Sequence, residues 1–90
     1  MSNFTGMDVA AVRQLAAQLN NKAAEIQSIA QQLSGQLEST AWVGPDREMF
    51  HGDWNGMHMN ALNNVCRALE SASQRATQNA NQQESTSNAG

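Results

Sequence analysis

Apolar side chains recur every three to four residues along the first half of the chain, between residues 9 and 37. This spacing places one apolar stripe along a helix and follows a heptad repeat. One position of the repeat is mostly alanine and the other is large, so a facing helix can approach closely on one side. Together these positions are Val9, Val12, Ala16, Leu19, Ala23, Ile26, Ala30, Leu33 and Leu37.

Leu15 and Ile29 widen this stripe beyond what one neighbouring helix can cover. A long helix with so broad an apolar face is stabilised mainly by burying that face in tertiary contacts. We therefore expect one neighbour from the same chain and another from a second chain. A monomeric hairpin with an exposed apolar face is the alternative, although large exposed apolar patches are rare in soluble monomers.

Both ends of the first helix carry local signals. Thr5 and Asp8 resemble a capping box in which Asp replaces Glu, and the apolar pattern stops near residue 39. The sequence therefore predicts a first helix over residues 6–39.

A break in the pattern follows at Trp42-Val43-Gly44-Pro45. Gly44 can adopt a positive φ where the chain reverses, and Pro45 suits the first turn of a new helix because its missing N–H would be unpaired there. Asp46 then lies where the helix dipole favours negative charge. A short turn over residues 40–45 forces the two helices to run antiparallel.

The second helix is predicted over residues 46–79, with an apolar period near 3.6 residues. Gly52 and Gly56 flank Trp54 within it. Because glycine destabilises a helix interior, these residues either make room for a close helix or a bulky ring, or mark a frayed first turn. Residues 80–90 contain nothing apolar larger than alanine and are predicted to be a disordered tail.

Length and charge exclude several functions. Ninety residues make one small domain with a marginal core, which favours help from a partner. The net charge is −3, and the five basic residues form no cluster, so neither nucleic acid nor an anionic membrane surface is an expected partner. No segment reaches the roughly 20 apolar residues of a membrane span, and no ordinary signal peptide is recognisable.

Candidate chemistry is sparse. His51 and His58 lie two helical turns apart, roughly 10 Å at 1.5 Å per residue, so they cannot share a metal ion and are read as solvated side chains. Cys66 is the single cysteine and is read as a buried packing residue. No nucleophile elbow or phosphate-binding loop is present. We therefore expect no enzyme, no cofactor and no metal.

Trp42-Val43-Gly44 on a tight turn between two alanine-rich helices resembles the WXG family, the early-secreted-antigen-like small substrates of type VII (ESX) secretion. The resemblance covers nearly the whole chain. It implies an all-α fold, an antiparallel two-helix hairpin with a WxG turn that dimerises into a four-helix bundle. It further implies export through the type VII machinery without a cleavable signal peptide, with Trp42 and Gly44 as part of a composite export signal.

One departure concerns that signal. The family's export tag, a tyrosine followed four residues later by an acid, is absent because the chain contains no tyrosine. The tag then lies on a partner, or a looser signal serves, or this protein is not itself recognised by the secretion motor.

The resemblance implies a homodimer, or a heterodimer with a paralogous WXG protein, and a motor ATPase contacted through this tail or the partner's tail. Two other functions stay open: an intracellular helical adaptor or chaperone for a larger secreted effector, and a membrane-disrupting helical protein. The expected interface residues are Val12, Leu15, Leu19, Ile26, Ile29, Leu33, Met57, Leu62, Val65 and Leu69.

Overall fold

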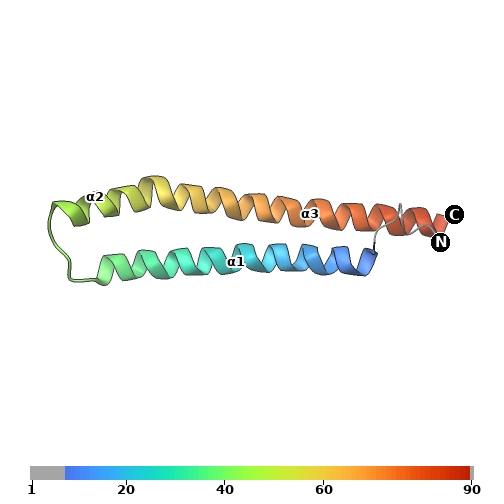
Figure 1. The fold of residues 1–90 in the computed structure, drawn as a ribbon, viewed down its shortest axis with the longest axis horizontal. Coiled ribbons are helices and arrows are strands. Elements are labelled where there is room, and N and C mark those ends of the chain that lie inside the picture. The colour runs from blue at the N-terminus through green and yellow to red at the C-terminus, as the bar shows by residue number, and fades with distance from the viewer. Residues whose placement is uncertain (1–7, 90) are drawn as a thin grey trace.

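Two long helical arms lie side by side in opposite directions in the computed structural model, which describes residues 8–89 (Figure 1). The first arm is α1, Val9–Ser39. The returning arm consists of α2, Pro45–Asp53, the π-helical turn η1, Trp54–His58, and α3, Met59–Ala89. The hairpin measures 67 × 18 × 17 Å. The predicted all-α, two-helix hairpin is confirmed.

The first turn of α1 is capped by Asp8, whose side chain accepts a hydrogen bond from the backbone N–H of Ala11 at 3.1 Å. This bond satisfies one of the amides that have no partner within the helix. Thr5, the cap that the sequence favoured, lies outside the described residues, and so does the predicted helix start at residue 6. Asp8 is thus the N-cap itself rather than the third residue of a capping box.

Small residues spaced by seven form the seam between the arms. α1 contributes Ala16, Ala23 and Ala30, and α3 contributes Cys66, Ser73 and Ala80, each at most 8% exposed. Small side chains on both sides let the helix axes approach closely. The seam is therefore the alanine side of the heptad, as the sequence indicated, and Cys66 is the buried packing residue that it predicted.

Two hydrogen bonds fix the register of the seam. The Ser73 hydroxyl donates to the carbonyl oxygen of Ala16 at 2.7 Å, and the Cys66 thiol donates to that of Ala23 at 3.4 Å. Both pairs are seven residues apart on each helix, so they belong to one alignment. A slide of either helix would break both bonds and leave the Ser73 hydroxyl buried without a partner, which is costly.

The C-terminal end corrects the sequence analysis. α3 continues to Ala89, where a helix end at residue 79 and a disordered tail over 80–90 were expected. Ala80 is fully buried, and the Arg13 guanidinium pairs with the Glu84 carboxylate at 2.7 Å. The expectation was wrong because it required large apolar residues, whereas this seam is built from small ones.

The π-helical turn η1 rotates the hairpin end relative to α3. Met59 continues the seven-residue repeat of α3, and counting back seven more reaches Gly52. The structure instead turns His51 toward Glu38 of α1 and Trp54 toward Ser34. A π-helical turn holds about one residue more than an α-helical turn, so the side chains before it shift by one position.

Gly52 and Gly56 make no room for any described part of this chain. A Cβ atom built on either glycine meets nothing within 4 Å. Both are exposed and lie within continuous helical structure, so the competing explanation of a frayed turn does not describe them either.

Candidate functional site

The turn between the arms, residues 40–44, is shaped by local hydrogen bonds. Thr40 ends α1, with its backbone N–H and its hydroxyl both donating to the carbonyl oxygen of Gln36, at 3.0 and 2.6 Å. Gly44 has φ 131° and ψ 175°, a conformation that L side chains rarely adopt, and Pro45 begins α2. The predicted positive φ at Gly44 is confirmed, and it explains why the third motif position is a glycine.

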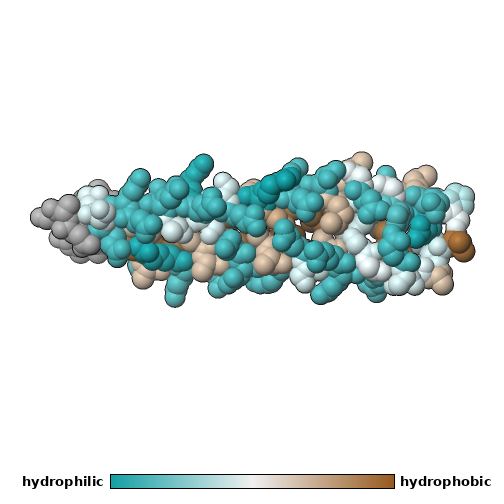
Figure 2. All heavy atoms as spheres, turned by 180° about the vertical axis from the view of Figure 1, so that it is seen from behind, coloured by the Kyte–Doolittle hydropathy of each residue, from teal (hydrophilic) through white to brown (hydrophobic). Residues whose placement is uncertain are grey.

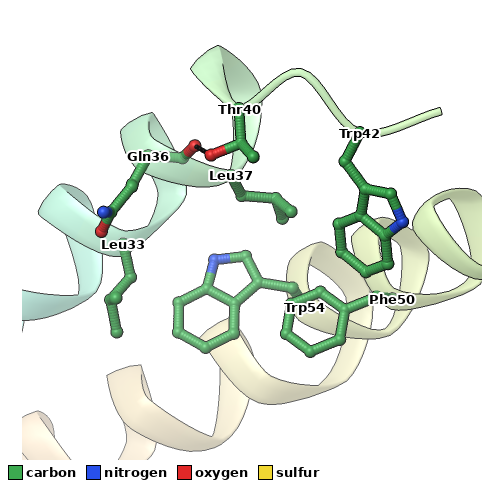
Figure 3. A pocket seen from close by; sticks show the side chains of 7 residues that line it. All are labelled: Leu33, Gln36, Leu37, Thr40, Trp42, Phe50 and Trp54. Carbon is green, nitrogen blue, oxygen red and sulfur yellow. Dashed lines mark hydrogen bonds between the residues drawn. The ribbon is translucent and has the colours of Figure 1, made fainter.

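Aromatic side chains from the turn, α2 and η1 surround a recess of about 270 Å³ at the hairpin end (Figure 3). The Trp42 and Phe50 ring centroids lie 5.9 Å apart, and Trp42 remains 40% exposed. The Trp54 indole N–H donates to the Ser34 hydroxyl at 2.7 Å. The Trp42 side chain therefore packs the turn against α2 and is also accessible from solvent. The lining residues are Leu33, Gln36, Leu37, Thr40, Trp42, Phe50 and Trp54.

A polar clasp closes the hairpin end. The Glu38 carboxylate on α1 is hydrogen-bonded to the His51 ring and lies 3.9 Å from the Arg47 guanidinium, which also pairs with Glu48. The hydrogen bond from His51, and then its charge, lower the pKa of Glu38, and the Arg47 charge lowers it further. His51 thus contacts Glu38 of the other arm and is not the solvated side chain expected from the sequence.

The clasp predicts a pH dependence. The folded-state pKa of Glu38 is below its unfolded value, so its stabilisation is present above the ordinary carboxyl pKa and is lost as pH falls through the lowered value. We expect the melting temperatures of the wild type and of Glu38→Gln to differ slightly at pH 6 and to converge in acid, once the Glu38 carboxylate of the wild type is protonated.

Thermal unfolding by circular dichroism across this pH range measures the difference. Asp53→Asn is a matched control, since Asp53 makes no ion pair among the described residues. The difference in melting temperature between this variant and the wild type should not shrink in acid as that of Glu38→Gln does. A constant offset for Glu38→Gln would contradict the role of the clasp.

Large apolar side chains line the arms beside the small-residue seam. Leu15, Ile29, Leu33 and Val65 are each exposed by about half, and Met57 by 62%. The remaining predicted interface residues are half-buried between the arms: Val12, Leu19, Ile26, Leu62 and Leu69. Figure 2 shows hydrophobic atoms along the junction of the arms and at the hairpin end, within an otherwise largely hydrophilic surface.

Titratable side chains do not gather into a metal site in the part of the chain that the structure describes, residues 8–89. His58 is exposed, with its ring 6.2 Å from that of Trp54. No helix within the same range is long and apolar enough to cross a membrane.

A WxG turn with a positive-φ glycine therefore joins two antiparallel helical arms, one over residues 9–39 and the other over residues 45–89, and an aromatic recess lies beside this turn. The sequence model of the family WXG100, described as proteins of 100 residues with WXG, matches residues 5–87. The chain belongs to the WXG100 family. No curated protein and no solved structure matches it significantly.

WXG100 proteins are small helical proteins of the early-secreted-antigen-like type, associated with type VII secretion. In this WXG100 chain, sequence reasoning found the turn motif and the apolar stripes. It missed the polar contacts that join the arms: Arg13 with Glu84, Ser73 with Ala16, Ser34 with Trp54, and Glu38 with His51. The spacing of Ser73, midway between Cys66 and Ala80, was the one signal that could have placed a polar residue in the seam.

Proposed function

We propose that the protein is a type VII secretion substrate, or the co-secreted partner of one, and that it acts by pairing with another helical hairpin. Two hairpins would form a four-helix bundle in which each covers the apolar face of the other. The partner is a second copy or a paralogous WXG protein. The family association with type VII secretion and the exposed apolar face support this proposal.

The apolar face carries the argument. Leu15, Ile29, Leu33 and Val65 lie on both arms, and each leaves 46–54% of its surface in water. Burying the exposed half of such a side chain is worth on the order of 1 kcal/mol. Because the small-residue seam already holds the arms together, these larger side chains are available to a second hairpin.

Export is proposed to depend on the turn, with Trp42 and Gly44 as the motif residues. The chain has no tyrosine, so the tag normally found after the second helix is proposed to come from the partner's tail. The secretion motor would then contact a surface shared by the two chains. The protein would leave the cell without a cleavable signal peptide.

A charge on the apolar face tests bundle formation. Ile29→Glu is expected to reduce the particle mass from that of a bundle to that of a single 9.7 kDa chain, because a carboxylate would be buried without a partner in the bundle but solvated in the free hairpin. Light scattering of the protein alone, and then mixed with the product of the adjacent gene, measures the mass.

Gln31→Glu is the matched control, since it adds the same charge two residues away at an exposed position on another side of α1. Its particle mass should equal that of the wild type. A wild-type protein that stays a folded monomer at high concentration, with and without the adjacent gene product, would contradict the proposal.

A further inference from the structure

The outer face of the hairpin end is the side of α2 and η1 that points away from α1. It is formed by Met49, Gly52, Asp53, Gly56 and Met57, whose spacing of three and four places them on one side of the helix. The opposite side contacts α1 through Arg47, His51 and Trp54. Gly56 and Met57 lie within the π-helical turn, and both are exposed.

Two large apolar side chains on this face are open to solvent. Met49 is 66% exposed and Met57 62% exposed. Between them, Gly52 and Gly56 leave the backbone uncovered, and apart from their chain neighbours and the adjacent helix backbone no described atom lies within 4 Å of where their Cβ atoms would be. Glycine weakens a helix relative to alanine, and nothing within the chain needs the space. Two small residues one turn apart let another helix approach closely, and methionine adapts to varied partners.

The charge of the molecule is concentrated at the same end. With histidine counted as neutral, residues 38–58 contain four acids and one base, a formal net charge of −3 that equals that of the whole chain, and two of these acids, Glu38 and Glu48, are paired with His51 and Arg47. The remaining residues carry four acids and four bases and are neutral. Asp53 lies on the outer face and Asp46 in the first turn of α2, and neither makes an ion pair among residues 8–89.

We propose that the outer face of the hairpin end docks a basic amphipathic helix of a partner protein. Its small or apolar residues would pack over Gly52 and Gly56 between the two methionines, and its lysine or arginine side chains would face Asp46 and Asp53. Charge complementarity selects a basic helix over an acidic one. Met57, which the sequence placed among the bundle-interface residues, is assigned here to the outer face instead. The bundle face of Leu15, Ile29, Leu33 and Val65 shares no residue with this surface, so the proposal goes beyond bundle formation and stands without it.

A pair of synthetic helical peptides tests the proposal. One carries an alanine and leucine stripe flanked by lysines, and the other has glutamate in place of every lysine. With the full-length protein, the lysine peptide is expected to shift the backbone NMR signals of residues 46–57 and to bind at least tenfold more tightly than the glutamate peptide. Its affinity is expected to fall with added salt. Equal binding of both peptides, or no binding of either at millimolar concentration, would overturn the proposal.

Glycine substitutions separate docking from folding. Gly52→Ala combined with Gly56→Ala is expected to raise the melting temperature of the protein and to lower its affinity for the lysine peptide at least tenfold, since the added methyl groups occupy space that only the ligand uses. Gly35→Ala is the matched control: Gly35 is an exposed helical glycine on α1 with nothing within 4 Å, so this variant should gain stability without losing affinity.

Carboxylate substitutions and concentration complete the test. The double variant Asp46→Asn and Asp53→Asn should bind the lysine peptide with lower affinity, and this affinity should depend less on salt concentration. Undiminished affinity in the double-glycine variant would exclude this face. NMR shifts at Leu15 and Ile29, on the bundle face, would also exclude the outer face. Shifts at residues 46–57 that appear on raising the protein concentration without peptide would exclude it too, because they would indicate a contact between copies of the chain.

Discussion

Substitution of Trp42 by alanine is expected to stop export of the protein into the culture medium while leaving its helix content almost unchanged. Trp42 lies on the non-helical turn, contacts Phe50 across the recess and keeps 40% of its surface exposed. The arms are held together by the buried seam between α1 and α3, which this substitution does not touch. The indole is therefore available to the export machinery at little structural cost.

The measurement compares culture supernatant with cell lysate in a host that has a type VII system, with circular dichroism of the purified variant. Val43→Ala is the matched control, because Val43 is the next residue of the turn and is 94% exposed. It should be exported normally. Undiminished export of the Trp42→Ala protein would remove the export role of the turn, and retention of the wild type in the cell would favour an intracellular adaptor.

Deletion of Asn55 is expected to detach the hairpin end from α1. Removing one residue turns the π-helical turn into an ordinary α-helical turn, which rotates α2 by about 100° relative to α3. Trp54 would leave the Ser34 hydroxyl, and His51 and Arg47 would leave Glu38. Because Trp54 is half-buried, we expect a loss of about 2 kcal/mol, roughly half the cost of truncating a core tryptophan.

Chemical denaturation gives the stability, and tryptophan emission gives the local structure. In a Trp42→Phe background, which leaves Trp54 as the remaining indole of the two in the chain, the deletion should shift the emission to longer wavelength. Asn55→Ala keeps the chain length and serves as the control, with emission like that of its parent. Unchanged emission and stability after the deletion would show that α2 is not oriented by the π-helical turn.

The recess and the clasp were only partly predictable from sequence. The roles of Trp42, Gly44 and Pro45 in the turn can be predicted from the local sequence, because a positive φ and a missing N–H are properties of single residues. The clasp between Glu38 and His51 depends on how two helices are rotated about their axes. No local pattern reports that rotation, and the extra residue in η1 changes it without any apolar signal.

By itself, the sequence determined two amphipathic helices, the glycine-proline turn that makes them antiparallel, and the WxG motif that places the chain in its family. Tertiary structure alone decided that α3 reaches Ala89, that Ser73 and Cys66 bond to carbonyl oxygens of α1, and that the Trp54 indole meets the Ser34 hydroxyl. The reason is physical: periodicity along one helix fixes which residues share a face. Which atoms that face meets depends on the register and rotation of the other helix.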